Sequence, residues 1–123
     1  MTFQHTGGPG VGKGTQCSRI AKDLDFEHIS VGDLLREEAN RPSSVYADFI
    51  NRSILESVII PAQLTCDLVK LKMNSAIKNG IQRFLIDGFP RSLDQAITFE
   101  EKVFSFCLLH ATTDTNIITV PDP

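Results

Sequence analysis

The chain has 123 residues, a length that fits one small domain. Its 41% hydrophobic and 22% charged residues are ordinary for a globular protein, and a net charge of −3 argues against a general nucleic-acid surface. The three cysteines form no C-x-x-C pair, which favours a reducing compartment. No apolar run approaches the length of a membrane span, and the first residues do not form a signal-peptide pattern. We therefore expect a protein of the cytoplasm, or of the cytoplasm and the nucleus, that binds neither membranes nor nucleic acid.

Helices and strands are predicted to alternate along the chain. Hydrophobic spacing, caps and breakers predict, in chain order, a helix over 13–25, a strand over 26–29, a helix from 30 that ends at Pro42, a helical stripe over 46–54, a helix over 62–78, a strand over 83–87 and a helix over 92–102. Two more short strands are possible over 104–109 and 117–120, although no predicted helix follows either. Strands separated by helices indicate an α/β fold with a parallel sheet.

The segment 7–15 reads Gly-Gly-Pro-Gly-Val-Gly-Lys-Gly-Thr and leads into the first predicted helix. A glycine loop that runs into a helix aims backbone N–H groups and the positive end of the helix dipole at one point, where a phosphate can bind. Lys13 adds a positive charge, and Thr15 offers a hydroxyl to a phosphate-bound Mg²⁺. The pattern G-x-x-x-x-G-K-[ST] departs at Gly14, because the threonine comes one place later. A chance glycine-rich turn is the alternative, which the agreement of loop, lysine, hydroxyl and helix disfavours.

Charged and polar residues follow the predicted strands elsewhere. Asp87 ends an apolar strand, where a Walker-B carboxylate would help to hold Mg²⁺, although a lone aspartate there is more often a turn former. Arg36 and Arg91 suit bidentate contact with a phosphate, although a lone arginine is more often a solvated surface residue. The amide of Gln95, four residues beyond Arg91, can read a base edge or serve as an ordinary polar group on a helix face.

Three motifs together resemble the nucleoside monophosphate kinases, the family of adenylate kinase and UMP–CMP kinase. They are the glycine loop, the segment His28-Ile-Ser-Val-Gly-Asp-Leu-Leu-Arg36, and the segment Asp87-Gly-Phe-Pro-Arg91 with Gln95. The sequence is especially similar to the fungal uridylate kinase type, over about residues 7–103. The resemblance implies ATP and Mg²⁺ as cofactors, and transfer of the γ-phosphoryl group to UMP, CMP or AMP by a monomer.

The resemblance also implies a domain plan. A P-loop NTPase-type parallel sheet flanked by helices would comprise residues 1–29 and 61–103, and a helical insert over 30–60 would bind the nucleoside monophosphate. Residues 104–123 would form a divergent tail, with the lid and the later strands of the family missing.

Roles carry over from the family to matching positions. The residues that would hold the ATP phosphates are Gly10, Val11, Gly12, Lys13, Gly14 and Thr15. Mg²⁺ would be held by Thr15 and Asp87, and the catalytic residues would be Lys13 and Arg91. The acceptor nucleotide would contact Val31, Arg36, Val58, Ile59, Ile60, Gly88, Phe89, Pro90, Arg91 and Gln95. Adenylate kinases usually carry threonine where this chain has Val31, so the valine favours UMP or CMP over AMP.

Three departures from the family pattern bear on activity. Thr2–Thr6 stands where the family has an apolar central strand, and burying Gln4 and His5 there costs roughly 1–3 kcal/mol each if they lack partners. The resemblance fades after about Val103, and no arginine follows Arg91, whereas the family's lid supplies several. We therefore expect a chain truncated before the lid, or a gene product whose ends have been replaced.

Two other interpretations stay open for such a chain. It can be a non-catalytic nucleotide-binding remnant, or a chain that cannot fold alone. A P-loop GTPase is disfavoured because the sequence has no Asn-Lys-x-Asp guanine motif.

Overall fold

The computed structural model describes residues 2–5, 13–110 and 115–120. In chain order, its elements are β1 (Thr2–His5), α1 (Lys13–Asp23), β2 (Glu27–Ser30), α2 (Val31–Ala39), α3 (Ala47–Leu55), α4 (Ala62–Lys78), β3 (Arg83–Asp87), α5 (Leu93–His110) and β4 (Asn116–Val120). The predicted α/β class is confirmed. None of the helices in this described part has the length and hydropathy of a membrane span.

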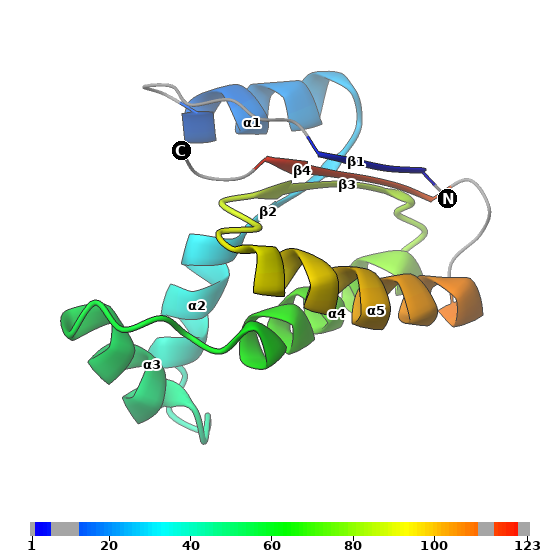
Figure 1. The fold of residues 1–123 in the computed structure, drawn as a ribbon. Helices are drawn as coiled ribbons and strands as arrows, with labels where there is room; N and C mark the ends of the chain where they lie inside the picture. The colour runs from blue at the N-terminus through cyan, green and yellow to red at the C-terminus, as the bar shows by residue number, and fades with distance from the viewer. Residues whose placement is uncertain (1, 6–12, 111–114, 121–123) are drawn as a thin grey trace.

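The four strands form one parallel sheet in the order β1-β4-β3-β2. Helix α1 covers one face of the sheet, and α4 and α5 cover the other (Figure 1). Helices α2 and α3 project to one side, beyond the end of β2. This arrangement is the flanked parallel sheet that the sequence predicts, with the helical insert attached at one edge.

Apolar side chains form a core on each face of the sheet. Between the sheet and α4 and α5, the buried side chains include Ile29, Val69, Met73, Phe84, Ile86, Phe89, Phe99 and Ile117. The rings of Phe89 and Phe99 meet edge to face, with centroids 5.2 Å apart. On the other face, Cys17 and Ala21 of α1 pack on Leu85. Burying each large apolar side chain contributes roughly 1.5–3 kcal/mol, so these clusters hold the layers together.

Local signals set the bounds of the helices. The hydroxyl of Ser30 accepts a hydrogen bond from the N–H of Asp33 at 3.4 Å, which caps the start of α2. The Ser92 hydroxyl likewise accepts from the N–H of Gln95 at 3.2 Å, at the start of α5. Helix α4 is followed by Gly80, whose φ of 86° is readily adopted only by glycine.

The segment 2–6 stands where the resembled family has its central strand, but its described part does not lie at the centre of this sheet. Strand β1 lies at the edge of the sheet and pairs with β4 alone. Between β1 and β3 lies β4, which is rich in β-branched residues and has Ile117 and Thr119 fully buried. Such residues suit a strand with neighbours on both sides. The predicted burial cost for Gln4 and His5 assumed the central position and does not follow from this arrangement.

The C-terminal region also differs from the sequence-based expectation. The segment 104–109 is helical rather than a strand, because α5 continues without a break to His110. The segment Asn116–Val120 forms β4, which confirms the short strand proposed over 117–120. One strand beyond residue 103 is therefore present, contrary to the expectation that all later strands are missing.

Candidate functional site

All four strands end at the same edge of the sheet. Ser30 of β2 pairs with Asp87 of β3, and Asp87 pairs with Val120 of β4. His5, the last residue of β1, pairs with Thr119. In open parallel sheets, ligands bind at the carboxyl ends of the strands. The end of β1 and the motif that begins at Asp87 therefore lie at one edge.

The first turns of α1 face the end of β3. Lys13, Gly14 and Thr15 form the start of this 11-residue helix. One turn further, the sulfur of Cys17 lies within 4.8 Å of the Asp87 carboxylate. The positive end of the helix dipole thus lies close to a buried acid, an arrangement that suits a phosphate with its metal ion. The predicted ligands Gly10, Val11 and Gly12, and the side chains of Lys13 and Thr15, fall outside the described residues.

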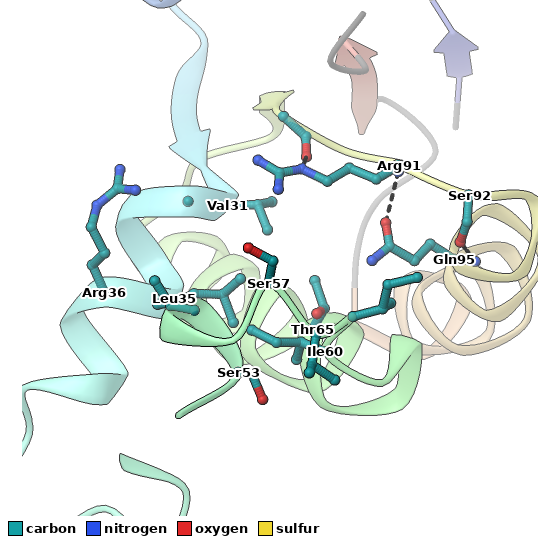
Figure 2. A pocket seen from close by; sticks show the side chains of 15 residues that line it. Val31, Leu35, Arg36, Ser53, Ser57, Ile60, Thr65, Arg91, Ser92 and Gln95 are labelled. Carbon is teal, nitrogen blue, oxygen red and sulfur yellow. Dashed lines mark hydrogen bonds between the residues drawn. The ribbon is translucent and has the colours of Figure 1, made fainter. Parts of the chain in front are cut away.

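A cavity of about 450 Å³ lies beside this edge, between α2, α3, α4 and the segment after β3 (Figure 2). Its volume is in the range of small-molecule sites. Its walls combine aliphatic side chains with hydroxyl, amide and guanidinium groups. It is lined by Val31, Gly32, Leu35, Arg36, Ser53, Ile54, Ser57, Val58, Ile59, Ile60, Thr65, Gly88, Arg91, Ser92 and Gln95.

The cavity brings together most of the residues predicted to contact the acceptor nucleotide. All of them line it except Phe89 and Pro90. Phe89 is buried in the core against Phe99, and Pro90 follows it through a cis peptide bond. Phe89 therefore belongs to the core and not to the cavity wall. The individual ligand contacts of the lining residues stay predictions.

Arg91 and Gln95 are held together at one side of the cavity. The backbone N–H of Arg91 donates to Oε1 of Gln95 at 2.7 Å, and Nε of Arg91 donates to the carbonyl of Gly88 at 3.3 Å. Gln95 is buried, and its amide nitrogen lies on the side of the cavity in Figure 2. Because the amide oxygen is already engaged, the side chain presents a hydrogen-bond donor to a ligand.

Arg36 lines the cavity, but its guanidinium turns away from the centre (Figure 2). Its Nη2 donates to the carboxylate of Asp33, and both side chains are mostly exposed. The hydrogen bond from Arg36 lowers the pKa of the Asp33 carboxyl. The guanidinium also lies over Gly32, where an added Cβ would come within 3.2 Å of both Nη atoms. The predicted clamp of Arg36 with Arg91 is thus not assembled in this conformation.

Thr65 lines the cavity although the sequence argument did not select it. Its hydroxyl is buried and has no hydrogen-bond partner among the described residues. A buried hydroxyl without a partner costs about 1–3 kcal/mol, and a polar ligand can supply the missing bond. A signal was available in the sequence, because Thr65 is a polar residue on the otherwise apolar face formed by Ala62, Cys66 and Val69.

Comparisons with known proteins identify the family. The sequence model of the adenylate kinase family matches residues 5–118, well past residue 103, where the motif-based resemblance ended. The chain therefore belongs to the adenylate kinase family. It is 52% identical over 98 residues to a uridylate kinase of Schizosaccharomyces pombe, covering 79% of this chain and 51% of that protein. It is 47% identical over 97 residues to a uridylate kinase of Saccharomyces cerevisiae, covering 79% of this chain and 48% of that protein. It is 45% identical over 106 residues to a UMP-CMP kinase of Lentinula edodes, covering 79% of this chain and 47% of that protein. The chain spans about half the length of the curated relatives that it matches.

Proposed function

We propose that the chain carries the acceptor pocket and the phosphate loop of a nucleoside monophosphate kinase. Such an enzyme transfers the γ-phosphoryl group of Mg·ATP to UMP or CMP and releases ADP and a nucleoside diphosphate. The observation that carries the proposal is the cavity at the carboxyl edge of the sheet, lined by Arg91 and Gln95 and adjacent to the strand end at Asp87. We expect it to act as a monomer in the cytoplasm, as predicted from the sequence.

The ATP phosphates are assigned to residues 10–15, which connect to the first turn of α1. Phosphoryl transfer needs two anionic substrates held in line, and it needs no protein nucleophile. Lys13 would neutralise charge on the transferring group, together with Arg91 on the acceptor side. The placement of the α1 start beside the end of β3 supports this assignment.

A magnesium ion fits the same edge. The Asp87 carboxylate is a hard oxygen donor, buried at the strand end and near the start of α1. Asp87 and the hydroxyl of Thr15 would hold the ion, which when bound neutralises charge on the ATP phosphates.

The acceptor is assigned to the cavity, with residues 30–60 as the insert that covers it. Arg91 would bind the acceptor phosphate, and the amide nitrogen of Gln95 would donate to an oxygen of the base. A pyrimidine offers such a carbonyl at O2. Val31 offers an apolar wall and no hydrogen bond, which favours UMP or CMP over AMP.

A second candidate is a non-catalytic module that binds a nucleoside monophosphate without turnover. One observation favours it: Arg36, which was predicted to bind the acceptor phosphate, is paired with Asp33. Loss of one charge-neutralising arginine can lower a phosphoryl-transfer rate by about 10³-fold or more.

A coupled assay for ADP formation separates the two candidates, using the full chain with ATP, Mg²⁺ and UMP, CMP or AMP. Binding of UMP is measured in parallel by calorimetry. Binding with turnover supports the kinase, and binding without turnover supports the module. If neither UMP nor CMP binds to a chain with a cooperative thermal transition, both candidates are wrong.

A further inference from the structure

We infer that Cys17, His28 and Asp87 form a binding site for a thiophilic divalent cation, with Zn²⁺ as the physiological candidate. The site needs no nucleotide, although it shares Asp87 with the proposed magnesium site. It draws one ligand from each of three elements: α1, β2 and β3.

The distances among the three side chains are those of a nearly formed metal site. One potential ligand atom from each residue lies within 4.8 Å of the others. Nε2 of His28 and Oδ2 of Asp87 are 3.3 Å apart. Two ligands bound at about 2.0–2.1 Å to a tetrahedral Zn²⁺ are separated by roughly 3.3 Å, so this pair needs almost no movement. The sulfur of Cys17 has to approach by roughly 1 Å to complete three ligands at tetrahedral geometry.

The ligands are held by the fold rather than by a loop. Cys17 and Asp87 are 4% and 7% exposed, and each belongs to a helix or strand of the packed core. The His28 side chain is 22% exposed and provides an access path from solvent. A largely preformed site of this kind loses little conformational entropy when the ion binds.

A further contact orients the histidine. The hydroxyl of Ser18 forms a 3.2 Å hydrogen bond with Nδ1 of His28, on the side of the ring away from Asp87. Metal-bound histidines are usually oriented in this way through the nitrogen that does not bind the ion. The imidazole is therefore positioned to offer Nε2 to a cation that Asp87 also binds.

The ligand set selects the type of ion. A thiolate and an imidazole favour Zn²⁺, Co²⁺ or Cd²⁺ over Mg²⁺, which prefers oxygen ligands. Binding requires the thiolate, so the Cys17 thiol loses its proton to solvent when the ion binds. Three protein ligands leave a fourth position for water. Because Asp87 is shared with the proposed magnesium site, the two ions would compete for it.

Cobalt titration of the full chain without nucleotide tests the inference. We expect a thiolate-to-cobalt charge-transfer band that saturates at one equivalent and disappears when Zn²⁺ is added. Cys17→Ser should abolish the band, whereas Cys66→Ser, which leaves the three ligands in place, should retain it. Ser18→Ala, at an exposed position, should weaken Co²⁺ binding about tenfold by releasing the histidine.

Thiol alkylation of the wild-type chain provides a test that needs no variant. Zn²⁺ should slow alkylation of Cys17, read from its peptide mass, whereas Mg²⁺ at the same concentration should not. A charge-transfer band that is absent, or that persists in a folded Cys17→Ser variant, would overturn the inference. Equal alkylation of Cys17 with and without Zn²⁺ would also overturn the inference. The three side chains would then be a His28–Asp87 hydrogen bond beside a buried thiol, and not a metal site.

Discussion

Replacing Thr65 by valine tests the acceptor pocket through two effects of opposite sign. Valine keeps nearly the shape of threonine and removes only the hydroxyl. That hydroxyl is buried at the cavity wall and lacks a partner among the described residues. The ligand-free protein should therefore gain stability, while a ligand that bonds to the hydroxyl should lose affinity.

The magnitudes follow from the cost of an unsatisfied polar group. Removing it should stabilise the free chain by about 1 kcal/mol, which raises the Tm of a protein of this size by roughly 4 °C. Losing one neutral hydrogen bond to the nucleotide should weaken UMP binding by about 0.5–1.5 kcal/mol, or roughly 2–10-fold.

Scanning calorimetry and UMP titration measure the two effects on the same samples. Thr115→Val is the matched control, because Thr115 also has a buried hydroxyl without a partner among the described residues but does not line the cavity. It should raise Tm in the same way and leave UMP affinity unchanged. If Thr65→Val raises Tm without weakening UMP binding, the hydroxyl does not contact the acceptor. If it lowers Tm, the reasoning about the unsatisfied group is refuted.

Three other predictions follow from the described contacts. Arg91→Met should weaken UMP binding about tenfold or more, because a charged hydrogen bond contributes about 1.5–3 kcal/mol; an unchanged Kd in calorimetry would contradict this role. Asp33→Asn should release Arg36 and strengthen UMP binding by up to about fivefold, since an exposed ion pair contributes about 0–1 kcal/mol; weaker binding would argue against Arg36 as a phosphate ligand. Burial raises the pKa of Cys66 from 9.0 to about 11, so the folded state retains a proton that the unfolded state loses. The contribution of this thiol to the free energy of unfolding should therefore be fully present below pH 9 and should be lost as the pH rises toward 11. The urea midpoints of Cys66→Ala should lack this part of the decline.

The elements with strong local signals could be predicted from the sequence. The bounds of β3 and α4 match those predicted, because one is a short apolar run ending in an acid and the other a long amphipathic stretch followed by Asn79-Gly80. The acceptor residues come from segments far apart in the sequence, and the motif resemblance was enough to predict that most of them converge. Phe89 and Pro90 were the exceptions. The large ring of Phe89 is better accommodated in the core than on the cavity wall.

Features that depend on how the helices and strands pack together in the folded chain could not be predicted. The order of the strands is one such feature, because the sequence alone did not show that β4 lies between β1 and β3. A short apolar run such as 104–109 suits a strand or a buried helix equally well, and continuity with α5 decided for the helix. The orientation of Arg36 was open to prediction, because Asp33 lies three residues earlier on the same helix.

The most direct test of the central claim is to titrate the isotope-labelled full chain with UMP and to follow its backbone amide resonances. The account predicts saturable shifts concentrated at Val31, Gly88 and Gln95, which line the cavity from α2, the segment after β3 and α5. Shifts at these amides should be much smaller in Arg91→Met at the same UMP concentration. Saturable shifts confined to other parts of a folded chain, or none at all, would contradict the assignment of the acceptor to this cavity.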